Sequence, residues 1–552
     1  MVRRSIKNKF KPIVVLFAFS FFICACGSKE EVNSYVEPIT FTFYNCDGSE
    51  DPWTDPVALE ITKATGVSLE TSYPQNENDT DIMLMIATGE LPDLVFAKGD
   101  SYLLIENDDL IDMSDLIDEY GPHIKELYGD DYDLLAYSSE DPSIYLLCSG
   151  QVEDENLETS GTCQLQWAVL SENNYEVPYT LEEYTNMIRD YMEKYPTING
   201  EPTIGISISV SDWHWYTTLS NPAGYIANGS VDNGQWIVTN DNEVLYKHTA
   251  DGQKEYFRWL NQMYHEGILD PDFATQTHED YISKIASGRV LGLLDASWDY
   301  GNAESSLMNE GMTNRTYAGL PVTLNENIKC ASLEQQNLRV GWGIGITKNC
   351  KDPVRAIQFI DWLCQKENQV LLNWGIEGVN YFYDENGLRY RTEDEIEKSL
   401  TDTNYISDTG VGAHSYPFPS YGNMAMDDSG NYINITSKKE VISEYNEEEL
   451  KALDAWGVEM LIDIFPQKEE FSEVYYTPLW SKLLDPEINE KLAKLDEISW
   501  ECLIDAIVCP EENFNNVWEG FQQKLIDAGV EELQEEMTGL VQSEVEFHMN
   551  LK

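Results

Sequence analysis

The residues of this sequence best suited to chemistry are tryptophans that stand beside carboxylates. Trp298 directly precedes Asp299 and follows Asp295, and Trp213 and Trp215 lie two positions apart in the stretch SDWHWYTT. A flat indole ring covers the C–H face of a sugar, and carboxylates accept hydrogen bonds from its hydroxyls, which are costly to bury unpaired. We therefore interpret these residues as candidates for binding a polyhydroxylated ligand.

Further candidates stand in loops or at the ends of predicted strands, where ligands of open α/β sheets bind. They are Trp53, Lys98, Asp100, Trp342, Trp374, Glu377 and Tyr381. Plainer alternatives stay open: a tryptophan can cover a core or pack at a hinge, and Lys98 with Asp100 can form a solvated loop pair. Trp213 and Trp215 face one side if their segment is extended, and they then line a binding site or cover a core.

Sequence motifs of known catalytic sites are absent. The chain contains no HExxH, GxSxG or Walker loop, and GWGIGI (341–346) lacks the GxGxxG spacing of dinucleotide-binding loops. Among 98 acidic residues, a carboxylate pair at glycosidase separation can still arise by chance. We therefore predict a binding protein without enzymatic activity or cofactor, and keep a secreted glycoside hydrolase as the alternative.

The formal net charge of −63 over 552 residues restricts the partners. Nucleic-acid backbones are bound by basic patches, so this chain excludes nucleic acid and disfavours anionic ligands. It suits a neutral or a cationic ligand, which leaves a cationic peptide open beside a sugar. A hydrophobic content of 42%, with 12% aromatic residues, argues against a disordered chain.

The N-terminal residues have the pattern of an exported protein. Five basic residues and no acidic one precede the apolar run 13–23, which is shorter than the roughly 20 residues that span a bilayer. The stretch ICACG (23–27) resembles a bacterial lipobox. We predict a signal peptide over 1–25, a lipid anchor at Cys26 with a tether over 26–36, and a location on the outer face of a bacterial cell membrane. An ordinary signal peptide cut elsewhere is the alternative.

Eight further cysteines are scattered along the chain without a CxxC pair. A chain of this length needs no disulfide scaffold, so we interpret most of them as buried small apolar residues. A disulfide between Cys502 and Cys509 is left open.

The pattern of apolar residues predicts an α/β fold. A strand over 40–47, a helix that begins near Pro56, a helix over 81–89 and an apolar strand over 94–97 follow one another, as in a parallel sheet covered by helices. Later segments predict a helix ending at Gly267, a helix and strand over 279–298, a strand over 340–346 followed by one long helix, and two helices around Gly529.

Several of these segments also occur in a recognisable order. They follow one another from about Thr40 to the end of the chain: TKATGVSLE, DIMLMIATGELPDLVF, YHEGILDPDF, ASGRVLGLLDASW, DPVRAIQFIDWLCQKENQ, NWGIEGVNY and WEGFQQKLIDAGVEELQEEM. The ordered set resembles the large lipoprotein-type extracellular solute-binding proteins of carbohydrate ABC importers, relatives of maltose-binding protein. The resemblance implies a two-lobed periplasmic-binding-protein-like fold of type II, with lobes joined by crossing strands and the ligand between them.

The same resemblance implies a division of the chain. The first lobe would comprise residues 37–165 and 340–380, and the second lobe residues 166–339 and 381–552. The segment from Leu388 to about Tyr475 is longer than in compact relatives, and the resemblance does not place it.

The resemblance also implies roles. The family's sugar-stacking tryptophan matches Trp298, and the loop that holds Trp53 faces the cleft. We therefore expect an oligosaccharide ligand, delivery to ABC permease subunits in the membrane, and a monomer. Many large members bind calcium in an acidic loop. Here YPTINGEPTIG places Tyr195, Thr197 and Asn199 at the ligand positions, so we predict no calcium at loop 195–206. We name no metal ligands elsewhere, and a calcium site outside this loop is left open.

Overall fold

The computed structural model describes residues 37–47, 53–74, 81–138, 141–149, 151–152, 154–159, 161–334 and 336–551. The predicted signal peptide and Cys26 lie outside these ranges. Contacts between residues divide the chain into two units, with the boundary between Glu37 and Pro38. Both lobes belong to the unit that begins at Pro38. Within the described part of the chain, no helix has both the length and the apolar character that crossing a membrane requires.

A five-stranded sheet carries the first lobe. Its order is β2 (Val67–Ser72), β1 (Ile39–Asn45), β3 (Leu94–Phe96), β14 (Gly343–Ile346) and β4 (Leu147–Cys148). β1 pairs in parallel with β2 and β3, and β14 is antiparallel to β3 and β4. The predicted parallel strand–helix–strand units are thus confirmed, and the later strand β14 completes the sheet.

Local sequence explains the first crossover helix. Pro56 opens α1 (Pro56–Thr65), and the Asp55 carboxylate caps it by accepting a hydrogen bond from the backbone N–H of Ala58 at 2.9 Å. Gly66 ends the helix with a positive φ of 70°. α2 (Asp81–Thr88) precedes β3, and α4 (Ser114–Tyr120), α5 (Pro122–Tyr128) and α12 (Pro353–Cys364) contribute to the core of this lobe.

A four-stranded sheet carries the second lobe. Its order is β13 (Tyr317–Leu320), β6 (Gly161–Gln166), β12 (Val290–Ala296) and β9 (Ile204–Ser207). β12 is parallel to β9 and antiparallel to β6. Gly292 is required in β12, because a Cβ there would lie 2.1 Å from the Tyr184 hydroxyl of α7 (Leu181–Lys194).

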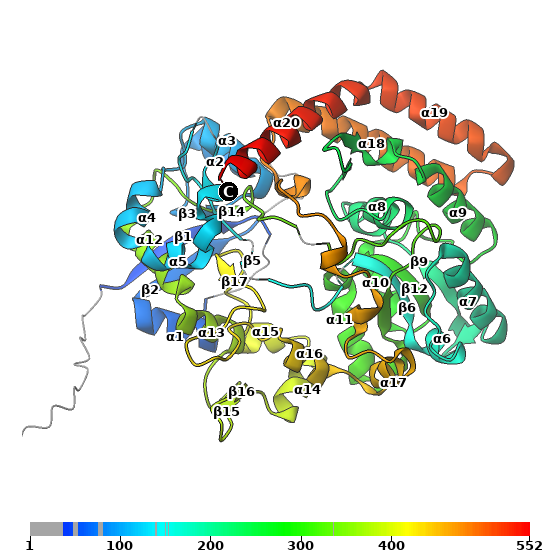
Figure 1. Cartoon of the computed structure of the whole chain (residues 1–552), viewed down its shortest axis with the longest axis horizontal. Helices are drawn as coiled ribbons and strands as arrows, with labels where there is room; N and C mark the ends of the chain where they lie inside the picture. The colour runs from blue at the N-terminus through cyan, green and yellow to red at the C-terminus, as the bar shows by residue number, and fades with distance from the viewer. Residues whose placement is uncertain are drawn as a thin grey trace, which may run out of the picture. The chain divides into compact units, whose positions relative to one another are not determined.

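Helices at the end of the chain also belong to the second lobe. α18 (Pro486–Val508), α19 (Phe514–Asp527) and α20 (Val530–Leu551) lie side by side (Figure 1) and share a core with α9 (Gln253–His265). The prediction of two helices around Gly529 is confirmed, and this glycine has a φ of 91°. The sequence patterns did not predict α18.

One predicted helix is wrong. The helix expected after β14 is two helices, α12 and α13 (Lys366–Trp374), because Gln365 between them adopts an extended conformation with ψ 135°. The Gln369 side-chain amide donates a hydrogen bond to the backbone carbonyl of Leu363 at 2.7 Å, which satisfies an acceptor that the break leaves free.

The remaining elements are mostly short. They are α3 (Ser101–Glu106), η2 (Gly129–Leu135), β5 (Gln151–Val152), α6 (Trp167–Glu172), β7 (Thr197–Ile198), β8 (Glu201–Pro202), η3 (Tyr216–Ser220), α8 (Asn221–Asn228), β10 (Trp236–Val238), β11 (Val244–Tyr246), α10 (His278–Ala286), α11 (Ser297–Asn309), β15 (Phe382–Tyr383), β16 (Arg389–Tyr390), α14 (Glu393–Thr401), α15 (Tyr405–Thr409), β17 (Ser420–Tyr421), α16 (Lys438–Glu444) and α17 (Glu447–Trp456), with single turns η1 (Lys98–Asp100), η4 (Lys247–Thr249), η5 (Thr313–Arg315), η6 (Leu461–Ile464), η7 (Lys468–Glu470), η8 (Leu479–Ser481) and η9 (Glu511–Asn513).

The segment that the resemblance left unplaced contributes to both cores. Phe418 and Tyr421 pack in the core of the first lobe, whereas Ala452 of α17 packs in that of the second. The exact boundaries between the lobes stay a prediction. Two sheets with separate apolar cores confirm the predicted two-lobed α/β architecture.

Candidate ligand-binding site

A cavity of about 1100 Å³ is lined by residues of both lobes. The first lobe contributes η2 and the end of β4, and the second contributes the end of β12, the start of α11 and residues of η3 and α8. Residues 331–334 and 336–339 and residues of the segment 460–475 line it as well. The volume slightly exceeds the range of about 300–1,000 Å³ that is usual for small-molecule sites, so the cavity has room for an extended ligand.

The lining of this cavity is strongly acidic. It holds Asp130, Asp131, Asp133, Asp154, Glu155, Asp232, Asp295, Glu334, Asp463, Glu469 and Glu473, against Arg339, Lys438 and Lys468. Two of the three basic groups are already paired, because Lys468 Nζ lies 2.7 Å from Glu155 Oε1 and Lys438 Nζ lies 2.8 Å from Glu459 Oε2. The cavity therefore favours neutral or cationic ligands over anions.

Two exposed tryptophans form a stacked pair, and one of them lines the cavity. Trp298, which lines the cavity, is 61% exposed, and Trp213 is 54% exposed. Their rings are nearly parallel, with centroids 6.2 Å apart and an angle of 10°. Large aromatic side chains left in solvent mark binding surfaces. We call Trp213 and Trp298 the tryptophan pair.

Sheet topology explains why these two residues meet. β9 and β12 are parallel neighbours, so their carboxyl ends lie at one edge of the sheet. The chain after β9 leads to Trp213, and α11 begins at Ser297 directly after β12. The buried run of β12 thus ends where Trp298 projects into solvent.

Trp215 is a correction to the sequence analysis. It is only 3% exposed and stacks on Trp500 of α18, with centroids 6.1 Å apart and an angle of 4°. The segment is a turn that enters the π-helical η3, so the strand alternation that would place Trp213 and Trp215 on one side does not apply. Trp215 therefore belongs to the core of the second lobe and not to the ligand site.

The candidates of the first lobe contact one another or the lobe's core. Lys98 Nζ lies 2.5 Å from Asp47 Oδ1 and 4.2 Å from the centroid of the Trp342 ring. The indole N–H of Trp53 donates a hydrogen bond to Thr62 Oγ1 at 2.8 Å. None of these residues is among those that line the cavity in the described part of the chain, and the same holds for the half-buried Asp100.

The candidates that follow α13 lie in a separate cluster. Tyr381 is buried against Trp374, with ring centroids 6.1 Å apart, and the Arg389 guanidinium lies 5.4 Å from the Tyr381 ring. Glu377 is exposed. Trp374 is buried, which fits a role in packing instead of ligand contact. Among the described residues, the lining of the cavity includes none of these four side chains.

Asp295 and Asp299, which lie on either side of Trp298 in the sequence, have buried side chains. Asp295, 2% exposed, accepts a hydrogen bond from the Tyr281 hydroxyl at 2.7 Å. Burial raises the pKa of Asp295 well above its usual value, and the neighbouring Asp299 carboxyl adds to the shift. Burial also raises the pKa of Asp299, although His278 and His214 oppose the rise.

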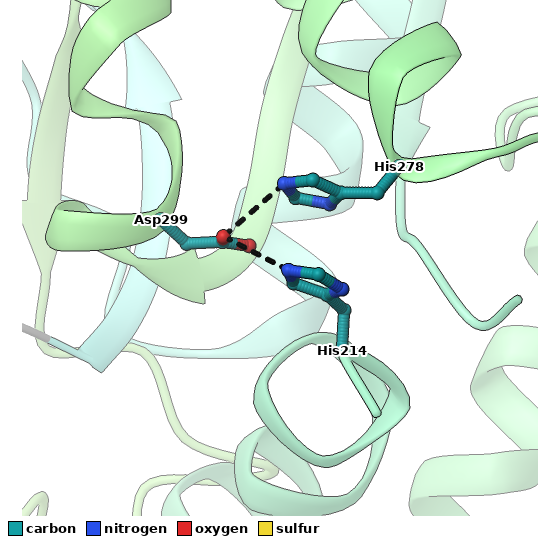
Figure 2. Close-up of side chains that lie close together, drawn as sticks. All are labelled: His214, His278 and Asp299. Carbon is teal, nitrogen blue, oxygen red and sulfur yellow. Dashed lines mark ion pairs between the residues drawn. The ribbon is translucent and has the colours of Figure 1, made fainter. Parts of the chain in front are cut away.

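His214, His278 and Asp299 form a cluster that the sequence analysis did not predict (Figure 2). Asp299 Oδ1 lies 3.5 Å from His214 Nε2 and 3.3 Å from His278 Nε2. The two imidazole rings stack, with centroids 3.6 Å apart and an angle of 8°. The three residues are far apart in sequence and match no local motif, so only the fold brings these possible metal ligands together.

Two smaller predictions concern the cysteines and the loop 195–206. Cys502 and Cys509 are free thiols, so the disulfide left open is not formed. The loop is a hairpin of β7 and β8 that turns at Gly200, which has a φ of 90°. The absence of calcium there stays a prediction.

Comparison with known proteins identifies the family of the chain. A family model described as bacterial extracellular solute-binding protein matches residues 57–373, more than half of the chain. The fructooligosaccharide ABC transporter substrate-binding protein FusA of Streptococcus pneumoniae serotype 4 is 24% identical over 344 residues, which cover 56% of this chain and 60% of FusA. Lipoprotein LipO of Bacillus subtilis strain 168 is 20% identical over 346 residues, covering 59% and 64%. The chain thus matches less than two thirds of the length of these curated relatives.

Solved structures resemble the fold over nearly the whole chain. A solute-binding protein described as binding HMO, from Bifidobacterium longum infantis, superposes with a TM-score of 0.66 at 16% identity, covering 92% of this chain and 99% of that one. FusA of S. pneumoniae in complex with kestose gives 0.65 at 17% identity, covering 93% and 100%. Alginate-binding protein AlgQ2 without calcium gives 0.63 at 17%, covering 91% and 98%. These likenesses confirm the type II two-lobed fold.

Proposed function

Because this chain belongs to the bacterial extracellular solute-binding proteins, which are binding proteins and not enzymes, we propose that it captures a neutral oligosaccharide in the cavity between its lobes. The observation that carries the proposal is the tryptophan pair, of which Trp298 lines an acidic cavity. Parallel exposed rings suit the apolar faces of successive sugar units, and the surrounding carboxylates suit hydroxyl groups.

The charge of the cavity lining and the ligands named for similar proteins support a neutral sugar over other ligands. Fructooligosaccharide and HMO are named for relatives, whereas alginate is named for AlgQ2. An anionic polymer such as alginate would meet eleven carboxyl groups and three basic ones in this cavity. A cationic peptide satisfies the charge equally well, but it would not need two parallel indole faces.

We also propose where the protein is anchored and to which partner it delivers its ligand. Cys26 would hold the protein by lipid to the outer face of the membrane, where two or three acyl chains suffice for stable anchoring. The monomeric protein would then deliver its ligand to ABC permease subunits. The likeness to lipoprotein LipO supports the anchor.

Native mass spectrometry of the purified protein against neutral oligosaccharides, anionic oligosaccharides and cationic peptides tests this function. We expect a neutral oligosaccharide class to bind at intact mass, without shorter products after long incubation. Binding of peptides alone would refute the sugar. Accumulation of shorter glycans would refute a binding role.

A further inference from the structure

We propose that His214, His278 and Asp299 form a binding site for one zinc-type transition-metal ion in the second lobe. The two histidine Nε2 atoms and Asp299 Oδ1 lie within 4.8 Å of one another (Figure 2). This site does not rest on the proposed function, because it follows from the three side chains alone.

The separations within the cluster fit metal ligation better than hydrogen bonding. Two donors bound to a tetrahedral zinc ion at about 2.0–2.1 Å lie about 3.3–3.4 Å apart. Asp299 Oδ1 lies 3.3 and 3.5 Å from the two Nε2 atoms. Ordinary histidine–aspartate pairs in this chain are closer: His123 with Asp361 and His414 with Asp55 both lie at 2.7 Å.

The hydrogen bonding of the cluster is incomplete without a cation. Asp299 has a side chain only 5% exposed, and its Oδ2 atom accepts no hydrogen bond from an N–H or hydroxyl group of the described residues. Its neighbour Asp295 is also buried. A buried carboxylate is costly unless it is paired or coordinates a metal, and two such groups side by side increase the cost. A divalent cation at Asp299 would offset this charge.

A carboxylate next to the cluster orients one of the histidines. His214 Nδ1 is hydrogen-bonded to Asp212 Oδ1 on the side of the ring away from Asp299. Metal-ligating histidines commonly donate their second ring N–H to a carboxylate, which leaves the other nitrogen unprotonated for the ion. Asp212 therefore holds His214 in the tautomer that a metal requires.

The donor set identifies the class of ion. Two imidazoles and one carboxylate are typical ligands of zinc and neighbouring first-row metals, whereas calcium and magnesium take oxygen ligands. Three protein ligands leave a fourth position for water or for a ligand oxygen. The sequence analysis named no ligands for such a metal ion.

An ion here would join three segments of the second lobe. His214 lies in the turn before η3, His278 begins α10, and Asp299 lies in the first turn of α11. Trp213 and Trp298 are chain neighbours of His214 and Asp299. The ion would therefore fix the spacing of the tryptophan pair, and this consequence, unlike the site itself, rests on the proposed function.

Zinc titration of the metal-free full-length protein by calorimetry, with metal content measured by elemental analysis, tests the site. We expect one equivalent to bind, and His278→Gln and Asp299→Asn each to weaken binding at least tenfold. His123→Gln is the matched control, since it removes a histidine from a simple aspartate pair, and it should bind as the unmodified protein does. Absence of stoichiometric binding, or equal affinity in all four proteins, would overturn the proposal.

A measurement on the unmodified protein covers the case in which a variant fails to fold. Cobalt(II) should give the visible absorption of a tetrahedral site with nitrogen ligands, and zinc should displace it. A spectrum of hexa-aqua cobalt only would overturn the site. If zinc binds while no oligosaccharide does, the metal site stands and the proposed function fails.

Discussion

Trp298 and Trp215 are the same residue type in the same lobe, but their surroundings give them different tasks. Trp298 keeps 61% of its surface in solvent at the cavity wall, whereas Trp215 keeps 3% and stacks on Trp500. An exposed ring adds little to folding and is available to a ligand. A buried ring contributes to the core.

We predict that Trp298→Ala weakens oligosaccharide binding about tenfold, or about 1.4 kcal/mol, because a stacking face is lost. The free energy of unfolding should change by less than about 0.5 kcal/mol, since the side chain is exposed. Calorimetric titration and urea unfolding measure the two effects. Tyr179→Ala, which removes another exposed aromatic side chain that is not among the residues lining the cavity, is the control and should leave affinity unchanged.

Trp215→Ala should show the opposite pattern. Removing this buried indole leaves a cavity against Trp500, and we expect the free energy of unfolding to fall by about 3–5 kcal/mol. Urea unfolding followed by circular dichroism measures the loss. An unchanged unfolding midpoint would show that the packing of this residue is misassigned.

At the scale of elements, the sequence predicted those helices and strands that a local pattern of apolar residues determines. The apolar run of β12, bounded by Gly288 and followed by Trp298, predicts both a buried strand and an exposed residue at its end. The segment that holds Trp213 and Trp215 is not extended, and the sequence left this open because a turn and a π-helix have no period-two signature. The His214, His278 and Asp299 cluster depends on the packing of three elements, which no spacing in the sequence reveals.

α18 contributes a buried carboxyl group whose protonation links stability to pH. Burial raises the pKa of Asp496 to about 7, although hydrogen bonds from the Tyr246 and Tyr216 hydroxyls, at 2.8 and 3.0 Å, oppose the rise. The unfolded chain has the ordinary value near 4. Between these values the folded state binds more protons than the unfolded state, so this group's stabilisation is complete below about pH 4 and is lost as pH rises through about 7.

We therefore expect Asp496→Asn to flatten the dependence of stability on pH. The unmodified protein should lose up to about 1.4 kcal/mol per pH unit from this group between pH 5 and 7, and the variant should not. Urea unfolding at pH 5, 6, 7 and 8 gives the two slopes. Parallel slopes would contradict the assignment of the raised pKa to Asp496.

At the scale of the whole molecule, the net charge of −63 separates ligand classes. Affinity for a neutral oligosaccharide should change by less than about twofold between 0.05 and 0.5 M sodium chloride, because no ion pair forms on binding. A cationic peptide would lose affinity severalfold over the same range. Calorimetric titration at both salt concentrations distinguishes the two, and a steep salt dependence would contradict the proposed neutral ligand.

The strand order of the first lobe has a consequence for biosynthesis. β14, which lies between β3 and β4, is encoded almost two hundred residues after β4, with the sheet of the second lobe in between. While the chain emerges from a ribosome or an export channel, β3 can pair only with β1. No strand connects β3 to β4 until Gly343–Ile346 appears. The second lobe's sheet, whose strands all precede residue 321, is available earlier. The sheet of the lobe translated first is thus completed after the sheet of the second lobe, and its unpaired strand edges require protection during export.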